Sequence, residues 1–155
     1  MASAQTISKL FGQAAIEVLD NDPGSASATV VSTDGSTKQM RDMANYGGFA
    51  VIAMPTVASS QITKLEIVAS SDSAGASNLT VVADSGTVAA DAPLVDYVCL
   101  EVTAEQIKEV DTSNVGLRYV GARITSANSG DEHAVVYIRH AARRPSSGVT
   151  ATYIS

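Results

Sequence analysis

Short hydrophobic runs separated by polar turn residues recur along most of this chain. The runs are rich in Val, Ile and Ala, and the segments between them are rich in Ser, Asp, Gly and Asn. This alternation is typical of an all-β fold, and it predicts an antiparallel β-sandwich or a jelly-roll-like barrel. The strands predicted most clearly are Phe49–Met54, Leu65–Ala69, Thr80–Ala83, Tyr97–Val102, Leu117–Ile124 and Ala134–His140.

Two of these runs differ in the number of faces that they predict to be buried. Phe49–Met54 is apolar at every position, which is typical of a strand covered on both faces. Pro55 ends this run because proline has no N–H for a strand ladder. Between Lys64 and Ser70, apolar and polar residues alternate, which predicts a strand with one buried and one wet face.

One short helix is predicted at Ala104–Val110 by a capping box. Thr103 can accept a hydrogen bond from the N–H of Gln106, whose side chain can reach back to the N–H of Thr103. Val102 before the cap and Ile107 four residues after it can form a hydrophobic staple. These signals together fix where the helix begins.

The first residues of the chain allow two interpretations. Residues 6–20 carry apolar residues at helical spacing, whereas residues 16–18 equally fit the start of a strand. We therefore divide the chain into an extended N-terminal arm (1–22), a β-sandwich domain (23–144) and an extended C-terminal tail (145–155). Both terminal segments are expected to order only against a neighbouring chain, because neither can pack a core alone.

The composition fits a single domain whose surface is covered by neighbouring proteins. The 155 residues suffice for one hydrophobic core. Only 17 % of the residues are charged, against about 25 % in an average soluble domain. An ordinary soluble β domain with Ser- and Thr-rich loops is the alternative. The net charge of −6 lacks the positive field that attracts a phosphate backbone, so we expect no nucleic-acid partner.

The sequence also carries signals about compartment. Cys99 is the single cysteine, so no disulfide forms within the chain, which fits synthesis in a reducing cytoplasm. No signal peptide is visible at the N-terminus, and no apolar run approaches the roughly 20 residues that cross a bilayer. We expect a soluble protein without a membrane partner.

Residues that do chemistry are scarce. His133 and His140 are seven positions apart, so on one strand they face opposite sides and cannot share a metal. No Gly-x-Ser-x-Gly elbow, phosphate loop or dinucleotide-binding glycine motif is present. Cys99 has no cation beside it in sequence, which favours a packing residue over a nucleophile. We expect no enzymatic activity, metal, cofactor or small-molecule substrate.

Three predicted strands each combine an aliphatic face with a face of Tyr, Arg and Glu. Tyrosine and arginine are enriched where two proteins meet, because each combines contact area with a polar tip. The alternative is a solvated face with cross-strand charge pairs. The interface candidates are Tyr97, Glu101, Tyr119, Arg123, Tyr137 and Arg139, together with Arg143 and Arg144 in the segment that follows the last strand.

The chain resembles the cement, or decoration, proteins of tailed-bacteriophage heads. The resemblance covers roughly Gly47 to Arg144 and rests on the acidic, Ala- and Ser-rich β composition. The stretches that carry it are Phe49–Pro55, Leu65–Asp72, Asp96–Val102 with the capped helix, and Leu117–Ile124. The resemblance implies a structural virion protein, often a homotrimer, that binds the major capsid protein on the outer surface of the shell. It assigns no role to any single residue.

Multivalent contact is the mechanism that this resemblance implies. A weak contact repeated around a symmetric oligomer becomes strong, because later contacts form at high effective concentration. Two other functions remain open. One is a different virion module, such as a tail-tube or receptor-binding β domain. The other is a small jelly-roll enzyme of the cupin type, which needs several metal ligands that converge inside the barrel.

Overall fold

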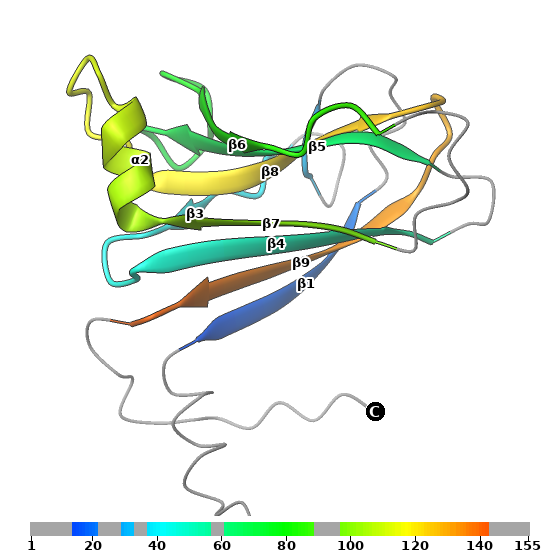
Figure 1. The fold of residues 1–155 in the computed structure, drawn as a ribbon, viewed down its shortest axis with the longest axis horizontal. Helices are drawn as coiled ribbons and strands as arrows, with labels where there is room; N and C mark the ends of the chain where they lie inside the picture. The colour runs from blue at the N-terminus through cyan, green and yellow to red at the C-terminus, as the bar shows by residue number, and fades with distance from the viewer. Residues whose placement is uncertain (1–13, 22–28, 33–36, 57–60, 89–96, 143–155) are drawn as a thin grey trace, which may run out of the picture.

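The computed structural model describes residues 14–21, 29–32, 37–56, 61–88 and 97–142. Within these residues the chain forms a mainly β structure with one short helix (Figure 1). The elements are β1 (Ala15–Asn21), β2 (Thr29–Val30), β3 (Arg41–Asp42), β4 (Gly48–Pro55), β5 (Ile62–Ser70), β6 (Thr80–Asp84), β7 (Val98–Thr103), α2 (Ala104–Val110), β8 (Tyr119–Ser126) and β9 (His133–His140).

Two antiparallel sheets pack face to face. The first sheet has the strand order β1-β9-β4-β7, and the second has the order β2-β8-β5-β6, with β3 also paired to β8. If the two-residue β3 is set aside, this order is that of a jelly roll, in which two Greek keys form a double-sheet sandwich. The predicted antiparallel β-sandwich is therefore confirmed, and its strands follow the jelly-roll order without closing into a barrel.

The hydrophobic core lies between the two sheets. Its largest fully buried aliphatic and aromatic side chains include Phe49, Val51, Ile62, Leu65, Ile67, Ile124 and Tyr137. The rings of Phe49 and Tyr137 meet edge to face, with their centroids 5.0 Å apart. Burying each side chain of this size contributes about 1.5–3 kcal/mol, so the contact between the sheets is the main source of stability.

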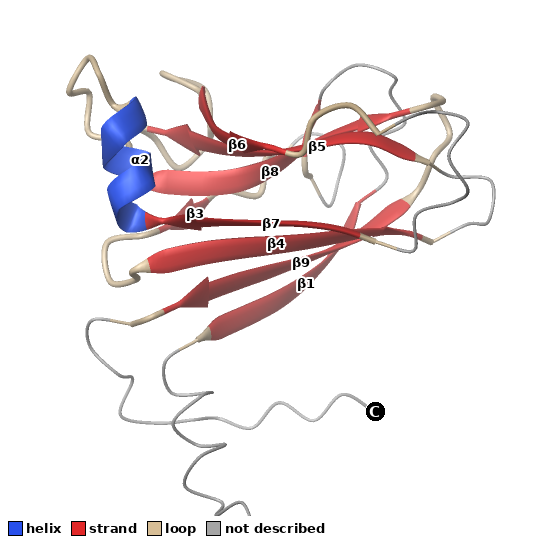
Figure 2. Ribbon diagram, in the orientation of Figure 1, coloured by secondary structure: helices blue, strands red, loops and turns tan. Residues whose placement is uncertain are grey.

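Helix α2 lies at one end of the sandwich (Figure 2). The predicted capping box is confirmed: the N–H of Gln106 lies 3.2 Å from Thr103 Oγ1, and the N–H of Thr103 lies 2.8 Å from Gln106 Oε1. Ile107 is buried against the core, so the helix closes this end of the structure. In the described part of the chain, no helix has the length and hydrophobicity to span a bilayer.

Strand β1 corrects the prediction for the N-terminal arm. Residues 15–21 pair with β9 along their whole length, from Ala15 opposite Arg139 to Asn21 opposite His133. The helical interpretation is wrong here, because successive side chains alternate between the core and the outer face. This stretch therefore orders against its own chain. The rest of the arm, residues 1–13 and 22, and the tail after Arg144 lie outside the described residues, so their predicted anchoring stays a prediction.

The outer face of β5 is buried, contrary to the predicted wet face. Glu66 is 3 % exposed, and Val68 is fully buried. Val68 packs with Val30 of β2 and with Met40, which precedes β3, in a second small apolar cluster. These long-range contacts cover a face that the local sequence pattern assigned to solvent.

Candidate protein-binding surface

Tyr137 does not belong to the predicted interface. Its side chain is 1 % exposed and lies in the core between the sheets. The buried N–H of Ala122 donates a hydrogen bond to the Tyr137 hydroxyl oxygen at 2.7 Å. Burial raises the pKa of Tyr137, so its hydroxyl stays neutral. The prediction for this residue is wrong because the tyrosine side of β9 is the inner side.

Arg139 lies on the same side of β9, where it fills an end of the sandwich. Its guanidinium Nη2 lies 2.9 Å from Glu17 Oε1, and its Nη1 donates to the carbonyl oxygen of Asp42 at 3.2 Å. The guanidinium also lies 4.7 Å from the ring centroid of Tyr46. Arg41 binds the other oxygen of Glu17. Arg139 is therefore engaged in contacts within its own chain.

Tyr119 and Arg123 lie on the outer face of the second sheet. Arg123 Nε lies 2.6 Å from Glu66 Oε2, and Lys64 Nζ lies within 3.0 Å of both Glu66 and Asp84. The Arg123 guanidinium, helped by Lys64, holds the pKa of Glu66 below its usual value. Tyr119 packs against the small apolar cluster of Val30, Met40 and Val68. On this side of the molecule, Arg123, Lys64, Glu66 and Asp84 form a network of ion pairs within the chain.

Tyr97 and Glu101 are the predicted residues that lie on the outer side of the first sheet. Tyr97 is 60 % exposed and directly precedes β7, and Glu101 is exposed within that strand. Glu101 Oε1 lies 2.9 Å from His140 Nε2, although the two atoms are not aligned as a hydrogen bond. Arg143 and Arg144 lie outside the described residues. The residues predicted to share one face therefore lie in separate places. Tyr137 is in the core, Tyr119 and Arg123 are on the outer face of the second sheet, and Tyr97 and Glu101 are on the outer side of the first sheet.

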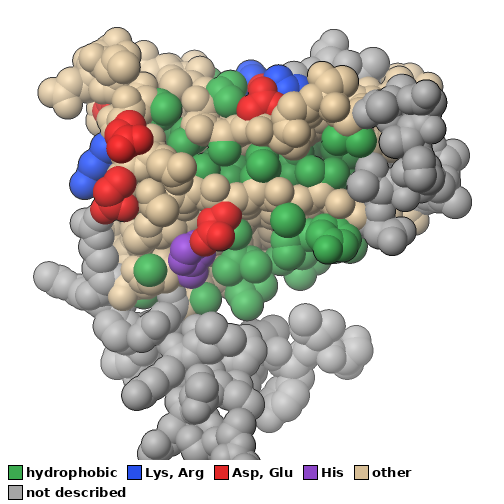
Figure 3. Space-filling model, in the orientation of Figure 1, with side chains coloured by type: hydrophobic (Ala, Val, Ile, Leu, Met, Phe, Trp, Pro, Cys, Tyr) green, Lys and Arg blue, Asp and Glu red, His purple; other side chains and the backbone are tan. Residues whose placement is uncertain are grey.

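The structure instead presents an apolar surface on the outer face of the first sheet. It consists of outward residues from all four strands, and we call it the outer apolar surface. Its members are Ile16, Val18, Ala50, Ile52, Met54, Cys99, Ala134, Val136 and Ile138. Hydrophobic side chains gather over this part of the molecule in the space-filling view (Figure 3).

Strand register places these side chains in continuous rows. Neighbours on one face of an antiparallel sheet have Cβ atoms about 4.5–5.5 Å apart. One row is Val18, Val136, Ile52 and Cys99, and the next is Ile16, Ile138, Ala50 and Glu101. At the β1 edge, Val18 is 65 % exposed and Ile16 is 49 % exposed. Such a surface gains free energy when another apolar surface covers it, at about 25 cal/mol for each Å² removed from water.

The sequence contains a signal for this surface that the pattern of Tyr and Arg residues does not include. Phe49–Met54 is apolar on both faces, and Ala134–Ile138 contains only one polar group, the Tyr137 hydroxyl. In strands of this kind, parity alone does not say which apolar face meets the core. The predicted interface lies on the Tyr137 side of β9, whereas Tyr137 points inward and Val136 and Ile138 point outward.

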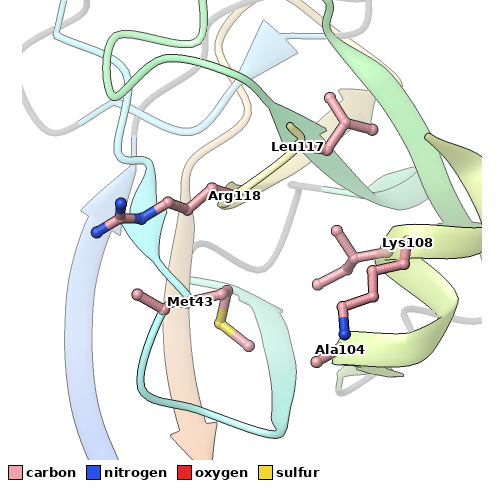
Figure 4. A pocket seen from close by; sticks show the side chains of 7 residues that line it. Met43, Ala104, Lys108, Leu117 and Arg118 are labelled. Atoms are coloured by element: carbon pink, nitrogen blue, oxygen red, sulfur yellow. The ribbon is translucent and has the colours of Figure 1, made fainter. Parts of the chain in front are cut away.

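A shallow cleft separates α2 from the loop that follows β3 (Figure 4). Its volume is about 140 Å³, which is room for a single side chain. The residues that line it are Met43, Ala44, Ala104, Ile107, Lys108, Leu117 and Arg118. Arg118 is occupied by a two-point ion pair with Asp42, at 2.7 Å from Nε and 2.5 Å from Nη2. The cleft therefore offers mainly apolar contact, with Lys108 and the paired Arg118 as its charged lining residues.

A buried Ser–His pair lies at the other end of β8 and β9. Ser126 Oγ lies 2.8 Å from His133 Nε2, and both side chains are at most 2 % exposed. Asp131 is close in sequence, but its carboxylate accepts the N–H groups of Asn128 and Gln61. A nucleophilic serine must open onto a substrate cleft. This pair is enclosed, so it joins the two strands as an internal hydrogen bond.

Metal-ligating side chains do not converge in the described part of the chain. There, no group of three or more His, Cys, Asp and Glu side chains is placed to hold a metal ion. Comparison of the chain with protein-family models, with curated proteins and with solved structures finds no match. The fold and the outer apolar surface are the features of the described residues that bear on function.

Proposed function

We propose that this chain is a structural virion protein that binds the outer surface of a bacteriophage capsid shell and stabilises it. The observation that carries the proposal is the outer apolar surface. Exposed Ile and Val side chains in adjacent rows are costly to leave in water, and contiguous patches of this kind mark protein interaction sites. A non-catalytic binding protein is the function that this geometry supports best.

The strand topology supports the proposal by analogy. Double-sheet jelly rolls recur in viral capsid proteins, and they also occur in lectins and cupins. A fold by itself does not assign a function. The surface chemistry favours a role like that of the capsid proteins over that of a lectin or a cupin, because an apolar sheet face suits contact with another protein.

Repeated weak contacts would supply the stabilisation. A rigid sandwich holds its binding surface in a fixed orientation, and each copy bridges neighbouring shell subunits. Linked contacts then act at high effective concentration, so a lattice is held more tightly than any single contact allows. In this proposal the protein acts at the virion surface, its partner is the major capsid protein, and no cofactor or turnover is needed.

Co-sedimentation with capsids tests the proposal. Empty capsids assembled from the major capsid protein of the same genome are mixed with the full chain, with an Ile16→Glu/Val18→Glu variant, or with a Val81→Glu variant. Val81 is a matched control, because it is an exposed valine on the outer face of the second sheet. We expect the wild type and the control to sediment with capsids, and the double variant to bind at least tenfold more weakly.

The outcome is decisive in both directions. Binding that the double variant retains in full would show that capsid binding does not depend on the outer apolar surface. Failure of the wild type to bind capsids would overturn the proposed function, and association with isolated phage tails would assign the chain to another part of the virion.

A further inference from the structure

We infer that the outer apolar surface binds the same surface of a second copy of this chain, so that two chains pair face to face. The inference deepens the proposed function, and it rests on that proposal in treating this surface as a protein interface. In this inference, a second copy of the same chain covers the outer apolar surface before or during assembly on a shell.

The first sheet has the composition of a sheet that is covered by another layer on each of its two faces. Strand β4 carries Phe49 and Val51 on its inner side and Ile52 on its outer side, and β9 carries Val135 inside and Val136 outside. Strands that are apolar on both faces are typical of sheets covered on both sides. Within the described residues, the chain covers only the inner side of this sheet. A third layer of similar size completes the arrangement.

A second sheet of the same kind fits this position. Stacked sheets pack about 10 Å apart, and their shared right-handed twist leads them to pack aligned, at about 30° to each other. An identical sheet has the same twist and the same width. Two-fold pairing through one self-complementary patch is also the commonest arrangement of soluble oligomers.

The net charge opposes pairing of two copies, and this repulsion is weakest at the outer apolar surface. Each chain carries a net charge of −6, so two copies attract only through a contact that keeps their charges apart. In the two central rows of the outer apolar surface the single charged residue is Glu101, which stands at the β7 edge beside His140. The outer face of the second sheet, by contrast, carries Lys64, Glu66, Asp84 and Arg123.

The area predicts a pair of modest strength. Four strands about 4.8 Å apart and about six residues long at roughly 3.3 Å each give a footprint of about 400 Å² per copy. The two copies together then bury about 800 Å², less than the roughly 1,200–2,000 Å² of a stable specific interface. We therefore expect a pair that forms at high protein concentration and that a symmetric assembly reinforces.

Sedimentation and the reactivity of Cys99 test the inference together. Cys99 is exposed and lies in the row of Val18, Val136 and Ile52, so a second copy would shield its thiol. The full chain is examined from about 5 µM to 1 mM, and its thiol is reacted with a bulky maleimide at each concentration. We expect the mass to rise from one chain toward two, and the rate of Cys99 labelling to fall by at least fivefold.

Matched variants locate the contact. Val18→Glu should remain a single chain with fast Cys99 labelling at every concentration, because it places a carboxylate on the apolar surface. Val81→Glu should pair as the wild type does. A new thiol in a Cys99→Ser/Val81→Cys variant should react at a rate that does not depend on concentration.

Other occupants give different results, and each would overturn the inference. A single chain at 1 mM whose Cys99 is always shielded indicates that the surface is covered within one chain. A single chain whose Cys99 becomes shielded only with capsids assigns the surface to the capsid, and a mass of three chains assigns it to the trimer implied by the resemblance. A pair that never binds capsids would support the inference and overturn the proposed function.

Discussion

At the scale of single residues, Tyr137 shows how one hydroxyl fixes the relation between the two sheets. Its ring packs against Phe49 in the core, and its hydroxyl accepts the buried N–H of Ala122 from the opposite sheet at 2.7 Å. The two interactions act on different strands, so the tyrosine holds β9 against β8. A residue with this role is a packing residue, although its type first indicated an interface.

Tyr137→Phe should therefore destabilise the protein by about 1–3 kcal/mol, because a buried N–H without an acceptor loses that much. The free energy of unfolding is measured by urea denaturation, with Tyr119→Phe as the control. Tyr119 lies half-buried on the outer face of the second sheet, so its change should stay within about 0.5 kcal/mol. Equal effects of the two substitutions would contradict the role assigned to Tyr137.

The sequence could not place Tyr137 because alternation along a strand defines two faces without saying which is inside. For β8, the aliphatic face with Val120, Ala122 and Ile124 is the inner one, so its Tyr/Arg face points outward. For β9 both faces are apolar enough to be buried, so the choice depends on packing against β4 and β8. Residue type alone then leads to the wrong face.

At the scale of elements, local signals located the strands and the helix, while long-range pairing decided the rest. The capping box fixed the start of α2, because all its partners lie within four residues. The strand character of β1 depends on β9, which is more than 100 residues away in sequence. The burial of the outer face of β5 likewise depends on distant residues of β2 and of the segment before β3.

The loop between β5 and β6 is also built by short-range contacts, and these make it sensitive to acid. The Asp72 carboxylate accepts hydrogen bonds from the N–H groups of Ala76, Ser77 and Ala74. These bonds favour the charged carboxylate and lower the pKa of Asp72 to about 2. The folded-state pKa thus lies below the usual value near 3.8.

Since the folded pKa is the lower one, the stabilisation from Asp72 is present above about pH 4. It is lost as the pH falls toward about 2. We expect Asp72→Asn to be less stable than the wild type at pH 5, and the difference to shrink steadily between pH 4 and pH 2. Thermal unfolding at a series of pH values measures this. A difference that stays constant over the range would contradict the account.

At the scale of the whole molecule, charge and hydrophobicity are separated onto different faces. Ion pairs occupy the outer side of the second sheet and one end of the sandwich, where Arg41 and Arg139 meet Glu17. The outer side of the first sheet is mainly apolar, with Glu101 and His140 as its ionisable pair. The low overall content of charge predicts a covered surface, and the strand pairing shows which face carries the least charge.

The central claim is that the outer apolar surface contacts another protein chain in the assembled particle. Electron cryomicroscopy of capsids carrying this protein tests the claim most directly, because it shows what lies against each face of the sandwich. We expect density from a second chain within van der Waals contact of Val18, Val136 and Ile52. A map in which this surface faces solvent on every bound copy would contradict the account.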